Sequence, residues 1–197
     1  FKTILSKLYH WKIYVVGSVE YQYPNHLFQA GYFLDKKYYD EKTIDFKHLL
    51  LSEKNQSLLK DIQNSNSVGV HIRRGDYMTK QNLVIFGNIC TQKYYHDAIR
   101  IITEKVNDAV FYVFSDDISW VQTHLDIPNA VYVNWNTGES SIYDMYLMSS
   151  CKYNIIANST FSYWAARLNK KTNMVIYPSK WYNTFTPDIF PESWCGI

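Results

Sequence analysis

The sequence predicts an α/β protein whose larger part is a Rossmann-like domain with a mainly parallel sheet. From residue 68 onward, short apolar runs alternate with stretches whose apolar residues recur at helical spacing. The runs are nearly continuous in apolar residues, which is typical of strands buried on both faces of a parallel sheet. Strands and helices that alternate in this way form a sheet with helices on both faces.

The expected elements of this domain follow one another in order. Strands are predicted at residues 68–72, 110–114, 131–133, 153–157 and 174–177. Helices are predicted at residues 94–106, 118–125, 143–150 and 161–168, from the spacing of their apolar residues. In such a sheet, ligands bind beyond the carboxyl ends of the strands, so the residues after each strand are the first candidates for a functional site.

The amino-terminal part of the chain is less regular. We expect a strand at residues 13–16 and a helix over residues 46–62 that is broken near Ser52. A polar, turn-forming cluster follows at residues 64–67 and predicts a domain boundary. The predicted domains are residues 1–65, a remnant of an amino-terminal domain, and residues 66–197. Because the chain begins with Phe1 rather than methionine, we expect that an earlier segment has been lost.

Composition excludes several classes of protein. A hydrophobic fraction of 47% in 197 residues is enough for a core, and a net charge of +2 gives no field that would favour nucleic acid as a partner. No apolar run reaches the roughly 18 residues of a membrane-spanning helix. The three cysteines form no CxxC pair, so a reducing compartment fits best. We expect a cytoplasmic location, with peripheral contact at the inner face of the bacterial cytoplasmic membrane as an open option.

Arginines stand at the end of the first strand of the predicted sheet. His71, Arg73 and Arg74 follow its apolar residues. A guanidinium presents paired donors that match phosphate oxygens, and it can stabilise a diphosphate leaving group without a metal ion. The alternative is a structural ion pair with Asp76 or Asp116. His71 could be a metal ligand, a base, a structural residue or a reader of a nucleotide base.

Adjacent carboxylates follow the second strand. Asp116 and Asp117 could hold a divalent metal ion or cap the helix that begins at Ile118, and capping is favoured for at least one of them. A DxD metal site has a spacer between its carboxylates, and these two residues have none. The sequence therefore predicts that no metal is bound.

Hydroxyl side chains and backbone amides meet at the start of the helix that follows the fourth strand. Asn158, Ser159, Thr160, Phe161 and Ser162 lie at this junction. A helix amino terminus has unpaired N–H groups and a partial positive charge, so the junction is a second candidate for phosphate binding. Capping of the helix by Ser159 or Thr160 is the alternative.

Other nucleotide-binding and hydrolase motifs are absent. The chain has no GxGxxG, no GxxxxGK[ST] and no GxSxG sequence. Dinucleotide oxidoreductases, P-loop NTPases and α/β-hydrolases are therefore disfavoured.

Sequence blocks in a fixed order resemble the bacterial α-1,2-fucosyltransferases of glycosyltransferase family 11. The blocks are residues 70–77, 114–120, 144–152, 154–164, 178–181 and 188–194. The HIRRGDY segment at residues 71–77 is fairly specific by itself, and its order and spacing with the other blocks strengthen the match. The resemblance covers about residues 31–197 and is strongest from residue 68 onward.

This resemblance implies a GT-B fold and an inverting, metal-independent transfer of L-fucose from GDP-β-L-fucose to a galactoside hydroxyl, in surface glycan synthesis such as that of lipopolysaccharide or capsule. The expected partners are GDP-fucose and a galactose-containing glycan acceptor, and no cofactor is expected. Two alternatives stay open. One is another GDP-sugar transferase of the same superfamily, and the other is a non-catalytic module that binds glycans through its aromatic residues, which make up 17% of the chain.

The resemblance also implies roles for single residues. Arg73 would contact the donor pyrophosphate with support from Arg74, while His71 and Asp144 would read the guanine edge. The residues that would line the phosphate and ribose pocket are Ser159, Thr160 and Phe161. The whole predicted donor-binding set is His71, Arg73, Arg74, Asp116, Asp144, Asn158, Ser159, Thr160, Phe161 and Ser162.

The catalytic prediction consists of Arg73 and Asp76. Asp76, Asp116 and Asp117 are the candidates for a general base, and each has a competing structural role. Stabilisation of the departing GDP by Arg73 would then matter more than the strength of the base. The chain also lacks the glycine-rich loop with Asn-Gln with which family members begin, so we expect an incomplete acceptor site.

Overall fold

The computed structural model describes residues 14–16, 28–30 and 45–197. Contacts within the chain define two compact units, of which the second comprises residues 45–186 and 190–197. In the first unit, strand β1 (Tyr14–Val16) pairs in parallel with strand β2 (Phe28–Ala30). The predicted strand at residues 13–16 is confirmed for the three residues that form β1.

The second unit is built on a six-stranded sheet in which every pair of neighbours is parallel. Its strands are β3 (Asn66–Ile72), β4 (Ala109–Ser115), β5 (Ala130–Val133), β6 (Tyr153–Ile155), β7 (Met174–Tyr177) and β8 (Cys195–Gly196). They lie in the order β5-β4-β3-β6-β7-β8. Counted from its own first strand, this is the 3-2-1-4-5-6 order of the Rossmann fold. The α/β class and the predicted Rossmann-like parallel sheet are therefore confirmed.

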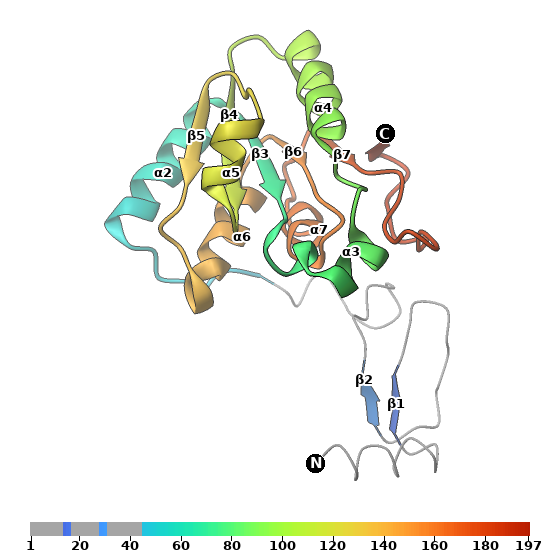
Figure 1. Ribbon diagram of the computed structural model, residues 1–197. Coiled ribbons are helices and arrows are strands. Elements are labelled where there is room, and N and C mark those ends of the chain that lie inside the picture. Colours follow the sequence, from blue (N-terminus) through green and yellow to red (C-terminus); the bar gives the residue numbers. More distant parts are fainter. Residues whose placement is uncertain (1–13, 17–27, 31–44) are drawn as a thin grey trace. The chain divides into compact units, whose positions relative to one another are not determined.

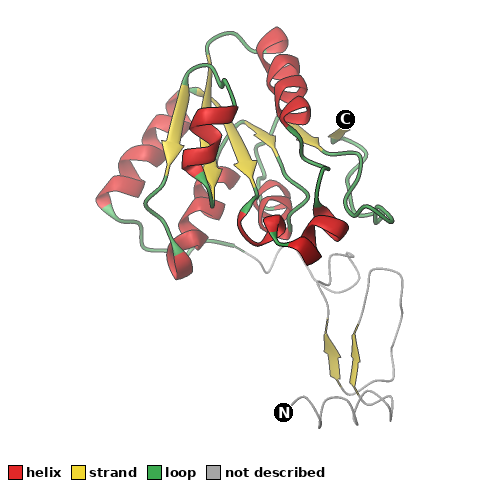
Figure 2. Cartoon of the chain, viewed as in Figure 1, coloured by secondary structure: helices red, strands yellow, loops and turns green. Residues whose placement is uncertain are grey.

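Helices cover both faces of this sheet (Figure 1). Helices α4 (Gln92–Lys105) and α5 (Ile118–His124) pack on one face. Helices α2 (Glu53–Asn64), α6 (Ser141–Ser149) and α7 (Thr160–Arg167) pack on the other. Figure 2 shows the strands between these helices. The four helices predicted from residue 94 onward are all present, with ends that differ from the prediction by at most two residues.

The predicted helix at residues 46–62 is wrong in its first half. Helix α2 begins at Glu53, and the Ser52 hydroxyl caps it by accepting a hydrogen bond from the Asn55 backbone N–H at 3.3 Å. Leu50 is 86% exposed, so the apolar residues before Ser52 do not extend a buried helical face. Their spacing resembled a helix by chance, whereas the predicted break at Ser52 marks the true start.

Short helices after β3 were not predicted. A 3₁₀ helix, η3 (Gly75–Met78), leads into α3 (Lys80–Phe86), and a second 3₁₀ helix, η4 (Gly138–Ser140), precedes α6. Helix α3 exposes Val84 and Ile85, so it has no buried apolar stripe from which a period could be recognised. The two-residue strand β8 is too short to carry a pattern.

Helix α2 belongs to the packing of the second unit. Leu58 and Ile62 on this helix join one core cluster with Leu147 and Met148 of α6. The predicted division between residues 65 and 66 assigns α2 to the first domain, whereas contacts within the chain begin the second unit at Asp45. Within the described residues, no helix combines the length and apolarity needed to cross a bilayer.

The side chains of β3 alternate between the two faces of the sheet. Val68, Val70 and Ile72 belong to the core beneath α4 and α5. Because successive strand residues point to opposite faces, Gly69 and His71 lie on the face covered by α2, α6 and α7. The fold thus decides which helices surround His71.

Gly69 leaves room for a buried amide on the neighbouring strand. It pairs in register with Asn154 of β6, and a Cβ at residue 69 would lie 2.8 Å from the Asn154 Oδ1 atom. The Asn154 amide is fully buried and has no hydrogen-bond partner among the described residues. Its place is therefore set by packing alone.

We expect Gly69→Ala to lower the free energy of unfolding by roughly 1–3 kcal/mol, because the added methyl group overpacks this contact. Asn154→Ala should recover part of the loss in the Gly69→Ala background, since it removes the clashing atom. Urea unfolding of the wild type, both single variants and the double variant measures this coupling. Strictly additive effects would contradict the packing explanation.

Candidate active site

The site lies where the chain reverses its direction across the sheet. After β3 the chain builds β4 and β5 on one side, and then returns to place β6 on the other side of β3. In sheets of this kind, the carboxyl ends of the two strands at such a switch point flank a ligand-binding crevice. The predicted arginines follow β3, and the predicted hydroxyl cluster follows β6, so the topology brings them to the same crevice.

Two contacts join the sides of this crevice. The Tyr77 hydroxyl donates a hydrogen bond to the Asn158 carbonyl oxygen at 2.9 Å. The rings of His71 and Phe161 lie with their centroids 5.1 Å apart. Segments that are distant in sequence are therefore held together by both polar and ring contacts.

Arg73 is held by two carboxylates. One guanidinium nitrogen lies 2.7 Å from Asp76 Oδ1, and another lies 2.8 Å from Asp116 Oδ2. The Arg73 side chain is 34% exposed, so its remaining N–H groups can be reached by a ligand. The ion pairs with Asp76 and Asp116, which were the structural alternative, are thus present. They leave a role of Arg73 in anion binding open.

Asp116 also fixes the turn after β3. Its Oδ1 atom accepts a hydrogen bond from the Arg74 backbone N–H at 2.9 Å. The approach is so close that a Cβ at residue 75 would lie 2.5 Å from Asp116 Oδ2. Gly75 is therefore required by space and not by an unusual backbone angle.

Arg74 points to a different environment from Arg73. Its guanidinium lies 3.7 Å from the ring centroid of Trp120, and its Nε atom is 3.2 Å from Asp117 Oδ2. Asp117 caps α5 by accepting the Trp120 backbone N–H at 3.1 Å, so the predicted capping role is confirmed for this residue. These contacts suit Arg74 for supporting the site rather than for gripping a ligand.

His71 is a buried, neutral imidazole. Burial lowers its pKa to about 3, and the nearby positive charge of Arg73 contributes in the same direction. At neutral pH one ring nitrogen is therefore a donor and the other an acceptor. Nδ1 has no hydrogen-bond partner among the described residues.

The amino terminus of α7 offers backbone N–H groups that no capping side chain binds. Ser159 occupies the capping position, but its hydroxyl makes no capping hydrogen bond. The Ser162 hydroxyl turns inward and lies 3.3 Å from the carbonyl oxygens of Ala157 and Ser159. Thr160 and Phe161 are partly exposed in the first turn. Ser159 and Thr160 are thus better placed than Ser162 to meet a ligand.

Asn158 joins three segments of the chain. Its Nδ2 atom donates to the carbonyl oxygens of Trp181 at 3.0 Å and Phe86 at 3.3 Å, and its Oδ1 atom lies 3.3 Å from Cys90 Sγ. Burial raises the pKa of the Cys90 thiol to about 12, so this cysteine stays protonated. The Asn158 side chain has internal partners at both ends, and its predicted contact with a donor stays a prediction.

Asp144 is a partly buried acid on α6, the helix that follows β5. Burial raises its pKa to about 7, against the opposing effect of a hydrogen bond from Asn136 Nδ2 to Asp144 Oδ1 at 2.7 Å. It lies on a helix that packs on the same face of the sheet as His71. The two residues predicted to read one ligand edge therefore share one face.

The raised pKa of Asp144 has a consequence for stability. Between pH 3.8 and about 7 the folded chain keeps a proton that the unfolded chain releases, so stability falls as the pH rises through this window. We expect Asp144→Asn to raise the melting temperature by a few degrees at pH 8 and by less at pH 5. Asp61→Asn, at an exposed position of α2, is the control in both melting curves. An equal effect of Asp144→Asn at the two pH values would contradict this prediction.

The carboxylates near the arginines pair with those arginines. Among the described residues, no group of three or more histidine, cysteine, aspartate or glutamate side chains is arranged to hold a metal ion. Asp116 and Asp117 face Arg73 and Arg74 instead.

Comparison with known proteins identifies the family. Residues 4–197 match the family model Glycosyl transferase family 11. The chain belongs to glycosyltransferase family 11. The resemblance carried by the HIRRGDY segment and the later blocks is thereby confirmed.

Relatives of this family member carry related names. The Alpha-1,2-colitosyltransferase of Escherichia coli is 35% identical over 196 residues, which cover 92% of this chain and 63% of that protein. The O-antigen biosynthesis glycosyltransferase WbnK of Escherichia coli is 44% identical over 122 residues, covering 61% of this chain and 40% of that protein. The Galactoside alpha-(1,2)-fucosyltransferase 2 of Pongo pygmaeus is 28% identical over 163 residues, covering 76% and 48%. The chain thus spans less than two thirds of the length of these relatives.

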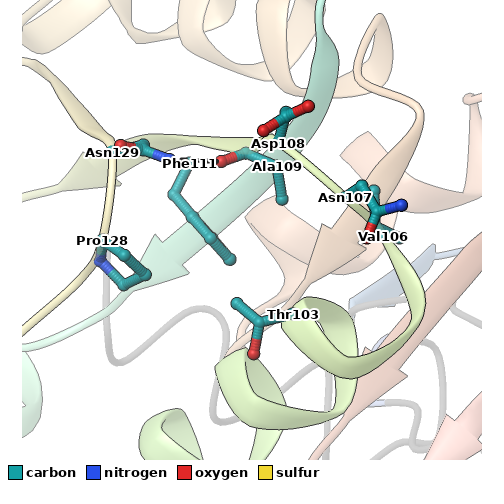
Figure 3. A pocket seen from close by; sticks show the side chains of 8 residues that line it. All are labelled: Thr103, Val106, Asn107, Asp108, Ala109, Phe111, Pro128 and Asn129. Atoms are coloured by element: carbon teal, nitrogen blue, oxygen red, sulfur yellow. Dashed lines mark hydrogen bonds between the residues drawn. The ribbon is translucent and has the colours of Figure 1, made fainter.

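Cavities lie at both ends of the sheet of this family member. One of about 230 Å³ adjoins the arginines and is lined in part by Arg73, Tyr77, Trp120 and Asn158. The other, of about 430 Å³, is lined by Thr103, Val106, Asn107, Asp108, Ala109, Phe111, Pro128 and Asn129 (Figure 3). It lies where β4 and β5 begin. The smaller cavity is the better candidate for binding at the arginines, because ligands of such sheets bind at the carboxyl ends. The residues of the predicted donor-binding set that do not line it include His71, Asp144, Ser159, Thr160 and Phe161.

Several residues of the site were missed at the level of sequence. Tyr77 bridges the crevice, Trp120 covers Arg74, and Asn136 contacts Asp144. Tyr77 belongs to the HIRRGDY segment and could have been selected from it. No sequence pattern marks Asn136, because one partner, Asn55, is 81 residues away and the other, Asp144, is eight residues away.

Proposed function

We propose that this chain carries the donor-binding half of an α-1,2-fucosyltransferase, which transfers L-fucose from GDP-β-L-fucose to a galactoside hydroxyl. The observation that carries the proposal is the Arg73 guanidinium at the switch point of a Rossmann sheet, opposite the amino terminus of α7. These two elements supply the positive field that a diphosphate requires. Surface glycan synthesis is the expected context, since one relative is named for O-antigen biosynthesis.

Arg73 would bind the diphosphate by exchanging carboxylate partners for phosphate oxygens. Asp76 is 56% exposed and Asp116 is 27% exposed, so the pair with Asp76 is the one that water and a ligand reach more easily. Phosphate matches the fork of a guanidinium as well as carboxylate does. The pair with Asp116 would then keep the guanidinium aimed while the pair with Asp76 is exchanged.

The proposed reaction is a single displacement with inversion. The acceptor hydroxyl oxygen attacks the anomeric carbon of fucose, and the bond from that carbon to the GDP oxygen breaks. GDP leaves with the electron pair, and Arg73 stabilises the charge that develops on it. The hydroxyl proton passes to a carboxylate, for which Asp76 is our choice, because exchange at Arg73 frees it beside the reacting groups.

The guanine base would lie on the face of the sheet that carries α6 and α7. His71 is buried on this face with an unsatisfied Nδ1 atom, and Phe161 offers a ring 5.1 Å away. Asp144 adds an acceptor from α6. A neutral imidazole and a carboxylate suit the mixed donors and acceptors of a guanine edge.

Arg73→Ala should weaken GDP binding by about tenfold or more, because it removes hydrogen bonds between charged groups. Arg73→Lys should fall between this variant and the wild type, since lysine keeps the charge without the fork. Titration calorimetry in the presence of a chelator measures the affinities. Arg100→Ala is the control, because Arg100 pairs with Glu104 on the exposed side of α4.

Undiminished GDP affinity in Arg73→Ala would overturn the role of this arginine. Galactoside binding without any thermal stabilisation by GDP would instead favour a glycan-binding module.

A second candidate function is colitosyl transfer, which the name of the 35% identical relative suggests. Colitose is L-fucose without its 3-hydroxyl group, so a site that donates or accepts a hydrogen bond there would discriminate between the two sugars. The protein should be assayed with GDP-fucose and with GDP-colitose, using lactose as the acceptor.

We expect transfer from GDP-fucose at the same rate with and without EDTA, because Arg73 and α7 take the place of a metal ion at the leaving group. Product linkage can be read by NMR. Loss of activity on chelation would contradict the metal-independent mechanism, and a preference for GDP-colitose would assign the second function.

A further inference from the structure

A chain of side-chain hydrogen bonds leads from α2 to Asp144. Trp135 Nε1 donates to Asn55 Oδ1 at 2.7 Å, and Asn55 Nδ2 donates to Asn136 Oδ1 at 3.0 Å. Asn136 Nδ2 in turn lies 3.1 Å from Asn55 Oδ1 and 2.7 Å from Asp144 Oδ1. Asn55 is a polar residue of α2, yet only 1% of it is exposed. Such burial of an amide is costly unless its hydrogen bonds are made, and here they are.

The direction of this chain is determined at its first member. The indole N–H of Trp135 can only donate, so the Asn55 oxygen must face it. The Asn55 nitrogen then faces Asn136, which requires the Asn136 oxygen to be turned toward α2. The Asn136 nitrogen then donates both to the Asn55 oxygen and to Asp144. The Trp135 indole N–H thus determines, through Asn55, that Asp144 meets the nitrogen and not the oxygen of the Asn136 amide.

The consequence for Asp144 is that its two oxygens are not equivalent. Oδ1 accepts the hydrogen bond from Asn136, whereas Oδ2 has no hydrogen-bond partner among the described residues. A carboxylate that is fixed through one oxygen keeps the other in a constant direction. Such a carboxylate can accept hydrogen bonds from the adjacent N–H donors of a ligand with little loss of side-chain entropy, because its rotamer is already fixed.

We propose that Asn136 is a positioning residue which, anchored by Asn55 and Trp135, orients the Asp144 carboxylate toward the N1–H and 2-amino donors of guanine. The inference rests on the proposed function, in which Asp144 reads the guanine edge. It assigns part of the base selectivity to α2, a helix that precedes the first strand of the sheet.

A purely structural role for the same network would make a different prediction. If Asn136 and Asn55 only attach α2 to the loop after β5, their loss lowers stability and weakens every nucleotide alike. Inosine diphosphate separates the two roles, because it differs from GDP only by the absence of the 2-amino group. The ratio of the two affinities reports the orientation of Asp144 and is insensitive to a uniform loss.

The experiment is titration calorimetry of GDP and inosine diphosphate at about pH 9, well above the pKa of about 7 of Asp144 in the wild type, because loss of the hydrogen bond from Asn136 raises that pKa. The wild type should prefer GDP by about 10-fold to 100-fold, the range expected for one hydrogen bond to a charged group. Asn136→Leu should reduce this preference to about threefold or less, because an unoriented carboxylate gains little from the extra donor. Melting temperatures of all variants are measured in parallel.

A second variant guards against failure to fold. Asn55→Leu with Asn136→Leu replaces both amides by apolar side chains of similar shape, which avoids leaving one of them buried without a partner. It should show the same loss of preference. Asn169→Leu is the matched control, because Asn169 is a buried asparagine that bonds to Cys151 O and the Lys171 backbone N–H, and it lies away from the site. This control should lower stability and leave the preference unchanged.

The outcomes separate the two levels of the proposal. If the wild type does not bind GDP, or does not prefer it, the proposed function and this inference fail together. If the wild type prefers GDP and either leucine variant that folds keeps the full preference, the inference alone is overturned. Loss of preference in Asn169→Leu as well would also overturn it, because a general loss of packing would then explain the effect.

Discussion

The Asp116 carboxylate is the contact on which the geometry of the candidate site depends. It follows β4 directly and reaches the end of β3, where one oxygen accepts the Arg74 backbone N–H and the other binds the Arg73 guanidinium. Because both bonds end on one carboxylate, the course of the chain and the direction of Arg73 are fixed together. The absence of a side chain at Gly75 is the condition for this approach. The proposed anion-binding group is thus held in one direction before any ligand arrives, which would reduce the cost of binding.

Because side chains alternate along β3, the proposed site has two regions, one for the base and one for the diphosphate. Ile72 faces the core under α4 and α5, while His71 faces α6 and α7. The residues proposed for the base therefore gather on one face, and Arg73 stands beyond the strand, at the edge between the faces. The hydrogen-bond chain from Trp135 to Asp144 extends the first region to α2. Asn55 of α2, the helix that precedes the first strand of the sheet, is in this way linked to the proposed guanine pocket.

Much of the fold could be predicted because its elements repeat simple patterns. The apolar run of β4 and the helical spacing in α4 are each long enough to be recognised, and their bounds were nearly correct. Prediction failed where burial does not follow apolarity, as at Leu50, which is 86% exposed. It also failed for α3, where Val84 and Ile85 are exposed although they are apolar. In both cases the sequence shows how apolar a residue is but not what covers it.

For this protein, the sequence by itself determined the class of fold, the family and the identity of the arginines that carry the proposal. These follow from local periodicity and from a motif that is continuous in the chain. Only the tertiary structure decided what each polar side chain meets: that Arg74 stacks on Trp120, that Asn158 ties three segments together and that Asn136 holds Asp144. The physical reason is that a hydrogen bond depends on distances of about 3 Å between atoms from distant segments. Those distances exist only after the strands have been ordered in the sheet.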